Sequence, residues 1–128
     1  MIYVDTSVAL AELLSEDRRP AAGFWTGVLV SSRLMEYEVW TALHRARRGR
    51  SHGAAARELL ARLAFVELTP EALERAREPF PKPVRTLDAL HLAAADFLRR
   101  SGQPVEIASY DDRLLAAARA LRFRLAKL

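Results

Sequence analysis

Short apolar runs alternate with longer amphipathic stretches along this sequence, and this alternation limits the possible folds more than any other feature. Strands that alternate with helices favour a mainly parallel sheet that is covered by helices on both faces. We therefore predict an α/β fold in three layers, with a central, mainly parallel sheet of four or five strands. The predicted strands are 1–4, 28–30, 65–68 and 105–109, with a short edge strand at 123–125, and the predicted helices include 8–14, 34–46, 53–63, 87–100 and 111–121.

Glycine, serine and proline predict where several helices begin and end. Gly49 follows a basic last helical turn, where a C-terminal cap is expected, and Ser51 is placed to cap the next helix. Pro70 after Thr69 is typical of a helix start, because proline is tolerated at the first helical position. The stretch 78–83 contains three prolines and is therefore predicted to be a loop.

The composition is that of a globular protein and excludes several kinds of site. We expect one domain over residues 1–128, since this length buries a substantial core. The chain has no cysteine, which excludes disulfides, thiolate zinc sites and cysteine nucleophiles and favours a reducing cytoplasm. No apolar stretch is long enough to cross a bilayer, so we expect neither a membrane segment nor a signal peptide. The net charge of +4 comes almost entirely from arginine, either as a compositional habit or as a surface for nucleic acid.

Four carboxylates stand near the ends of predicted elements. Asp5 follows the first strand, and Asp111 follows the strand at 105–109. Asp88 lies in the first turn of the helix after the proline loop, and Glu38 lies one turn into the helix that begins near residue 34. In open parallel sheets, ligands bind beyond the carboxyl ends of the strands. The fold therefore allows these four side chains to meet in one cleft.

Each acid also has an ordinary structural explanation. Asp5 and Asp111 are suited to cap helices, the helix dipole favours Asp88, and Glu38 can reach solvent or pair with an arginine. If the four carboxylates converge on one site, their mutual repulsion must be relieved. They must then take up protons or hold a cation. Oxygen ligands with no histidine or cysteine expected nearby suit Mg²⁺ or Mn²⁺ rather than zinc. Such a metal beside a basic surface indicates hydrolysis of phosphodiesters.

The motifs around these acids resemble those of PIN-domain ribonucleases, and more narrowly the VapC toxins of type II toxin–antitoxin modules. The resemblance runs nearly end to end and in the right order. Its most specific piece is the stretch around Asp88. The motifs are M-I-Y-V-D-T-S at 1–7, S-S-R-L-M-E-Y-E-V-W-T-A-L at 31–43, R-T-L-D-A-L-H-L-A-A-A at 85–95 and A-S-Y-D-D-R-L at 108–114.

This resemblance implies a single PIN domain that acts as a Mg²⁺- or Mn²⁺-dependent endoribonuclease. Asp5 and Asp88 correspond to direct metal ligands, with Glu38 and Asp111 completing the pocket or orienting water. Thr6 corresponds to a hydroxyl beside the metal and the scissile phosphate. Glu36 competes with Glu38 for its role, and Asp112 competes with Asp111. The family also implies a homodimer that is silenced by a cognate, VapB-like antitoxin.

Several basic residues are candidates for contacting RNA. Arg45, Arg47 and Arg48 form the best phosphate-binding run, although a solvated helix end explains them equally well. Arg85 stands three residues before Asp88 and is suited to steer a phosphate or to pair with an acid. His91, one turn after Asp88, is expected to be a packed, hydrogen-bonded histidine.

Other functions compete with the nuclease. A PIN-like domain without catalysis would bind RNA or a partner protein and use the acids only as caps. A phosphoacceptor receiver would need a lysine after a late strand, whereas the only lysines are Lys82, in the proline loop, and Lys127. A phosphatase with the D-x-D motif is disfavoured because Ser7 stands where the second aspartate is required.

Overall fold

The computed structural model describes residues 1–128 and contains one five-stranded sheet. The strand order is β3-β2-β1-β4-β5, and every neighbouring pair is parallel. The predicted α/β fold with a mainly parallel sheet of four or five strands is therefore confirmed. The strands are β1 (Ile2–Val4), β2 (Leu29–Ser32), β3 (Ala64–Val66), β4 (Glu106–Ala108) and β5 (Arg124–Leu125).

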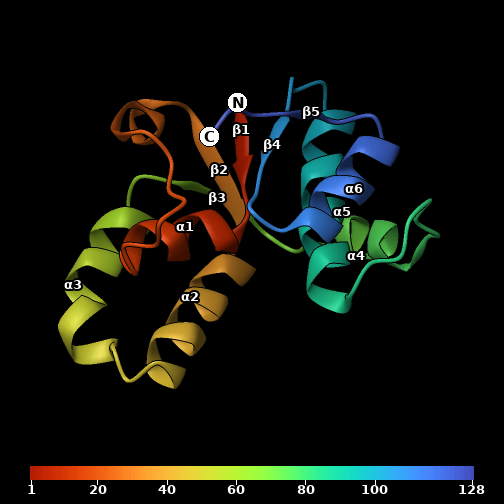
Figure 1. Ribbon diagram of the computed structural model, residues 1–128. Helices are drawn as coiled ribbons and strands as arrows, with labels where there is room; N and C mark the ends of the chain where they lie inside the picture. The colour runs from red at the N-terminus through yellow and green to blue at the C-terminus, as the bar shows by residue number, and fades with distance from the viewer.

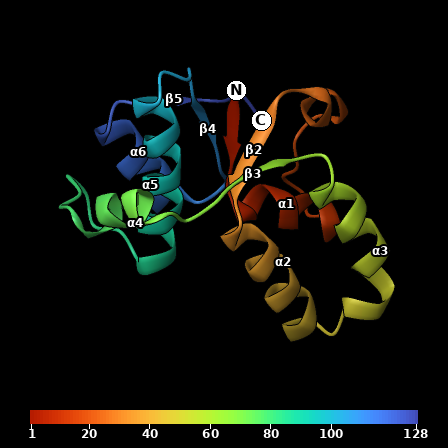
Figure 2. The same ribbon diagram turned by 180° about the vertical axis from the view of Figure 1, so that it is seen from behind.

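Helices cover both faces of this sheet. Figures 1 and 2 show α1, α2 and α3 on one face and α4, α5 and α6 on the other, which gives the three layers expected from the sequence. None of these helices has the length and apolar character needed to cross a membrane. The helices are α1 (Thr6–Leu13), α2 (Leu34–Arg45), α3 (Gly49–Leu60), α4 (Pro70–Arg77), α5 (Thr86–Arg100) and α6 (Asp112–Ala120), with a short 3₁₀ helix, η1 (Ala22–Thr26), before β2.

Successive strand residues point to opposite faces and build two separate cores. In β1, Val4 packs in the core under α1, α2 and α3, whereas Tyr3 packs in the core under α5 and α6. Both side chains are almost completely buried. A sheet that is buried on both faces explains why the strands read as continuous apolar runs rather than as an alternating pattern.

Two of the predicted helix boundaries are confirmed in detail. Thr69 caps α4 by accepting a hydrogen bond from the backbone N–H of Ala72 at 3.3 Å, and Pro70 is the first helical residue. At the other end of the fold, α5 stops before Gly102, whose φ of 89° lies in the left-handed region that glycine tolerates best.

The predicted boundary between α2 and α3 is wrong. Gly49 does not cap α2 but is the first residue of α3, and the left-handed residue after α2 is Arg47, with a φ of 57°. Ser51 does not cap α3, since its hydroxyl donates to the Arg48 carbonyl oxygen. A Cβ at position 49 would lie 3.0 Å from the ring of His44, so glycine here allows the close approach of that ring and is not used for a positive φ.

A buried carboxylate joins α4 to α5 on the side of the sheet away from α1. Asp96 is 2% exposed and pairs with Arg75 at 3.0 Å, Arg99 at 2.5 Å and Arg100 at 3.0 Å. Arg75 is itself buried, and its guanidinium also lies over the ring of Phe80 at 4.6 Å. Asp96 therefore contributes to the packing of the two helices.

Candidate active site

A cleft of about 430 Å³ opens beyond the carboxyl ends of β1 and β4. From β1 the sheet extends through β2 and β3 toward one edge and through β4 and β5 toward the other edge. The strand order therefore reverses between β1 and β4. Parallel α/β folds bind their ligands at such a switch point. The cleft is lined by Asp5, Thr6, Ser7, Leu10, Glu38, Arg85, Thr86, Leu87, Asp88, His91 and Asp111.

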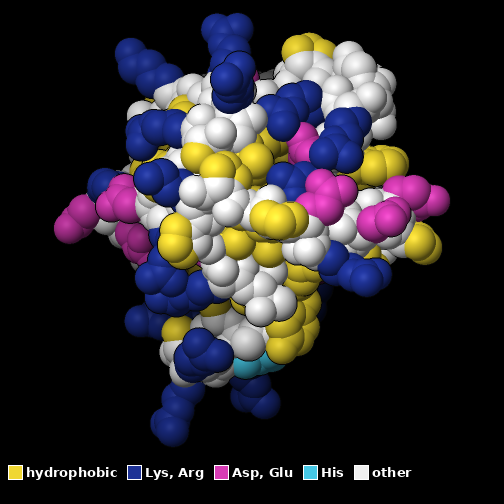
Figure 3. All heavy atoms as spheres, turned by 90° about the vertical axis from the view of Figure 1, so that its right-hand side faces the viewer, with side chains coloured by type: hydrophobic (Ala, Val, Ile, Leu, Met, Phe, Trp, Pro, Cys, Tyr) yellow, Lys and Arg dark blue, Asp and Glu magenta, His cyan; other side chains and the backbone are white.

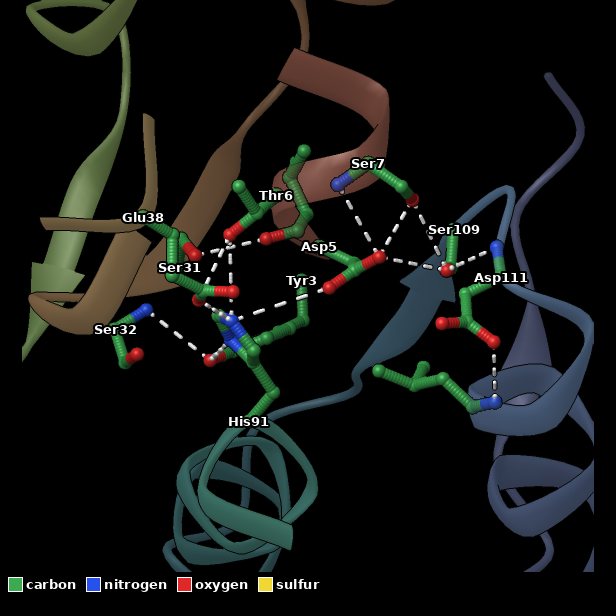
Figure 4. Close-up of polar contacts among 12 residues, drawn as sticks. Tyr3, Asp5, Thr6, Ser7, Ser31, Ser32, Glu38, His91, Ser109 and Asp111 are labelled. Carbon is green, nitrogen blue, oxygen red and sulfur yellow. Dashed lines mark hydrogen bonds and ion pairs between the residues drawn. The ribbon is translucent and has the colours of Figure 1, made fainter. Parts of the chain in front are cut away.

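Asp5 is held at the start of α1 by three hydrogen bonds to one oxygen. Its Oδ2 accepts from the backbone N–H of Ser7 at 3.3 Å, the hydroxyl of Ser7 at 2.5 Å and the hydroxyl of Ser109 at 2.8 Å. Ser109 follows β4, so this contact ties the ends of two neighbouring strands together (Figure 4). The residue is only 6% exposed, and Oδ1 accepts no hydrogen bond from the protein.

Glu38 reaches the same cleft from the first turns of α2. Its Oε1 accepts a hydrogen bond from the hydroxyl of Thr6 at 3.0 Å and lies 2.5 Å from Nε2 of His91. Its Oε2 accepts no hydrogen bond from the protein. Thr6 uses its one hydroxyl hydrogen on Glu38, so its oxygen remains available as an acceptor.

Asp88 and Asp111 repeat this pattern at two other helix starts. Oδ2 of Asp88 accepts from the backbone N–H of Arg85 at 3.2 Å. Oδ1 of Asp111 accepts from the backbone N–H groups of Arg113 at 2.9 Å and Leu114 at 3.2 Å. The other oxygen of each carboxylate accepts no hydrogen bond from the protein. One oxygen of each acid thus accepts hydrogen bonds from the protein, in a capping role where the acid starts a helix. The other oxygen accepts none, and all four acids line the same cleft.

No arginine or lysine neutralises these acids through a direct ion pair. None of the salt bridges of the structure includes Asp88 or Asp111, and Asp5 and Glu38 pair only with His91. Burial raises the pKa of the Asp88 carboxyl, and the negative charges of Asp111 and Asp5 raise it further. Asp88 therefore lies within electrostatic reach of two other acids of the cleft.

The donor set suits a hard divalent cation. All four acids offer oxygen, which Mg²⁺ and Mn²⁺ prefer, and each has one oxygen that accepts no hydrogen bond from the protein. No group of three acidic or histidine side chains lies close enough together to form a complete ligand set. Mg²⁺ does not require one, because it usually binds through one or two carboxylates and fills its shell with water and substrate phosphate oxygens.

The structure separates the alternatives that the sequence left open. Glu38 lines the cleft, whereas Glu36 forms a surface ion pair with Arg33 at 2.9 Å. Asp111 also lines the cleft, while Asp112 is exposed and lies outside it. The expectation that Glu38 pairs with an arginine is wrong, since its partners are Thr6 and His91. Its side chain is still 17% exposed.

His91 is packed and hydrogen-bonded as predicted, but its partners make it part of the cleft. It is 2% exposed, and its two ring nitrogens contact Tyr3 and Glu38. Burial alone would lower the pKa of His91, but the hydrogen bond to Glu38 and the charge of Asp5 outweigh it and raise the pKa above its ordinary value. The spacing of three residues from Asp88, on one face of a helix, was the signal in the sequence that pointed to this place.

The predicted RNA-contacting arginines occupy two different places. Arg85 lines the cleft. Arg45, Arg47 and Arg48 are exposed at the turn between α2 and α3, and none of them takes part in a salt bridge. Arg45 lies seven residues after Glu38, or about 10 Å along the helix. These three residues therefore form a separate basic surface, which we call the α2–α3 turn surface.

Comparison with known proteins points to one family. The model of the PIN domain family matches residues 2–120. Ribonuclease VapC46 of Mycobacterium tuberculosis (strain ATCC 25618 / H37Rv) is 34% identical over 124 residues, covering 94% of this chain and 92% of that protein. Ribonuclease VapC47 of M. tuberculosis (strain CDC 1551 / Oshkosh) is 32% identical over 131 residues, covering 96% of this chain and 93% of that protein.

A solved structure gives the same result for the fold. The crystal structure of M. tuberculosis VapC20, described as a sarcin-ricin loop cleaving toxin, superposes with a TM-score of 0.68 at 26% sequence identity. The match covers 91% of this chain and 95% of that one. The likeness thus extends over nearly the whole sheet and both helical layers.

Proposed function

The chain belongs to the PIN-domain family, as a VapC-like member, and we propose that it is a Mg²⁺- or Mn²⁺-dependent endoribonuclease that hydrolyses RNA phosphodiesters as the toxin of a type II toxin–antitoxin module. The observation that carries this proposal is the arrangement of Asp5, Glu38, Asp88 and Asp111. They come from four separate segments, they line one cleft, and each keeps one oxygen without a protein hydrogen bond. Helix capping alone does not explain why acids from four separate segments line the same cleft.

The chain's own residues divide the work of the proposed reaction. Asp5 and Asp88 are the direct ligands for the divalent cation, and Glu38 and Asp111 complete the pocket and orient the attacking water. The cation, when bound, lowers the pKa of water and offsets the charge that develops on the phosphate. Thr6 holds Glu38 through its hydroxyl hydrogen, and its oxygen lies 3.4 Å from Nε2 of His91. Arg85, at the rim of the cleft, is placed to contact the phosphate.

Removal of the metal tests this proposal directly. Purified protein is expected to cleave RNA with added Mg²⁺ or Mn²⁺, to lose that activity in EDTA and to regain it when the metal is restored. The expected loss is on the order of 10³-fold, because the metal contributes several kcal/mol to the reaction barrier and each 1.4 kcal/mol is a factor of ten. Cleavage that persists in EDTA would contradict the proposal. RNA binding without any cleavage would instead identify a PIN-like binding domain.

The α2–α3 turn surface is proposed to contact the RNA backbone outside the cleft. Figure 3 views the molecule from the side of α4, α5 and α6 and shows Lys and Arg side chains spread over this face in several groups, with acids between them, so net charge alone does not define a binding path. Arg45 and Arg48, in contrast, have no acidic partner in the structure. Their guanidinium groups therefore remain available for phosphates.

Replacing Arg45 and Arg48 with alanine is expected to weaken RNA binding and to reduce its dependence on salt. Each lost phosphate contact lowers the slope of log K against log salt by about 0.7 for a single strand. Mn²⁺ binding should be unchanged, because neither side chain lines the cleft. Arg124→Ala is the matched control, since Arg124 is exposed and pairs with Glu106. An unchanged salt slope in the double variant would remove this surface from the RNA path.

The expected partners follow from the family. We propose that a cognate, VapB-like antitoxin silences the enzyme, that the active form is a homodimer, and that both proteins act in the cytoplasm. Co-purification from the native host, followed by sequencing of the RNA ends that appear on induction, identifies the antitoxin and the RNA target together.

A further inference from the structure

A continuous chain of hydrogen bonds runs from the core of the protein to Glu38. The backbone N–H of Ser32 donates to the hydroxyl oxygen of Tyr3 at 3.1 Å. That hydroxyl lies 2.8 Å from Nδ1 of His91, and Nε2 of His91 lies 2.5 Å from Oε1 of Glu38 (Figure 4). Tyr3 and His91 are both buried, so the chain reaches the cleft through the protein interior and not through solvent.

The hydrogen bonds that link Tyr3, His91 and Glu38 all donate toward Glu38 when His91 is neutral. A phenol keeps its hydroxyl hydrogen at neutral pH, so the Tyr3 hydroxyl can both donate and accept. The Tyr3 oxygen already accepts from the Ser32 backbone, which leaves its hydrogen to donate to Nδ1 when His91 is neutral. The neutral ring then carries its hydrogen on Nε2, next to Glu38. In the doubly protonated ring Nε2 also carries a hydrogen, so His91 donates to Glu38 in either state.

We propose that His91 is a positioning residue that fixes the Glu38 carboxylate for metal binding, and that Tyr3 holds the His91 ring for this task. The inference rests on the function proposed above. Two donors, the Nε2–H of His91 and the hydroxyl of Thr6, hold the same oxygen of Glu38. The carboxylate is therefore fixed by one oxygen, and Oε2 is left for a cation or for water.

The surroundings of His91 favour this role over simple packing. The ring lies between two of the proposed metal-site acids, because Nε2 is also 3.9 Å from Oδ1 of Asp5. Its neighbour Leu92 is equally buried but packs in the core under α5 and α6, away from the cleft. Donors that orient a metal-binding side chain typically change metal affinity or activity by 10- to 100-fold when they are removed.

His91→Leu tests the proposal with Mn²⁺ alone as the probe. Leucine fills a similar volume with an apolar side chain and removes the donor to Glu38. Mn²⁺ affinity, measured by electron paramagnetic resonance on the full chain without RNA, is expected to fall about 10- to 100-fold. Leu92→Ala is the matched control, because it should lower the melting temperature without changing Mn²⁺ affinity. A folded His91→Leu variant that binds Mn²⁺ as tightly as the wild type would overturn the proposal.

Two further variants separate positioning from packing. His91→Gln retains an N–H group at the place of Nε2 and is expected to recover most of the Mn²⁺ affinity that leucine loses. Tyr3→Phe keeps the shape of the ring but frees His91 from its anchor, and it should weaken Mn²⁺ binding more than Leu92→Ala does. If His91→Leu does not fold, this last comparison decides, and equal affinities in Tyr3→Phe and the wild type would overturn the proposal.

Failure of this inference is distinct from failure of the proposed function. A wild-type protein that neither binds Mn²⁺ nor cleaves RNA would overturn the nuclease itself, and the positioning role with it. If the wild type binds Mn²⁺ and cleaves RNA, and His91→Leu binds Mn²⁺ and cleaves RNA equally well, only the role of His91 is overturned.

Discussion

Asp88→Asn is expected to abolish metal-dependent RNA cleavage and at the same time to raise the melting temperature. Asparagine keeps the shape of the side chain, and its carbonyl oxygen can still accept from the Arg85 backbone. The substitution removes one of the two proposed direct metal ligands. Cleavage should therefore fall on the order of 10³-fold, the same loss that is expected on removal of the metal. A residue that served only to cap α5 would leave RNA cleavage unchanged in this variant.

The sign of the stability change follows from the pKa of Asp88. Burial and the charges of Asp111 and Asp5 raise this pKa in the folded protein. A carboxyl whose pKa is higher folded than unfolded stabilises the fold when protonated, and this stability is lost as the pH rises through that interval. The melting-temperature difference between Asp88→Asn and the wild type should therefore grow from acid toward neutral pH and then stay constant.

Asp112→Asn is the matched control for this experiment. Asp112 is also an aspartate in the first turn of a helix, but it is exposed and lies outside the cleft. It should retain cleavage and a melting temperature near that of the wild type. Cleavage by Asp88→Asn at the wild-type rate would show that Asp88 holds no essential metal.

Asp96→Ala is expected to reduce the free energy of unfolding by about 3–5 kcal/mol, as is typical when one partner of a buried ion pair is removed. The substitution leaves the buried guanidinium of Arg75 without its carboxylate and deprives Arg99 and Arg100 of theirs. Urea unfolding measured by circular dichroism gives the change. Arg124→Ala breaks a surface pair instead and should cost at most about 1 kcal/mol.

A double variant shows whether the loss comes from the unpaired charge. Replacing Asp96 with leucine and Arg75 with methionine removes both buried charges, and it should recover much of the stability that Asp96→Ala loses. A loss of less than 1 kcal/mol in Asp96→Ala would show that α4 and α5 are held together by apolar contacts alone.

The fold was predictable because each strand carries its signal locally. A sheet covered on both faces requires uninterrupted apolar strands, and the segments around Tyr3 and Ile107 have that character. Thr69 and Pro70 marked the start of α4 for equally local reasons. The error at Gly49 arose because the helix after the turn begins earlier than the pattern suggests, and Arg47, not a glycine, takes the left-handed conformation after α2.

The cleft-lining acids were predictable from topology, but their partners were not. Asp5 and Asp111 follow neighbouring parallel strands, so their proximity follows from the sheet. The contact between His91 and Glu38 joins residues 53 positions apart on two different helices. Nothing local in the sequence pairs them, because the distance depends on how α2 and α5 pack on opposite faces of the sheet.

Anomalous diffraction from crystals soaked in Mn²⁺ tests the central claim most directly, namely that carboxylates from distant segments share one divalent cation. We predict a peak in the cleft, within coordination distance of both Asp5 and Asp88, that is absent from Asp88→Asn crystals. A cleft without anomalous signal at saturating Mn²⁺, in a protein that still cleaves RNA, would contradict it.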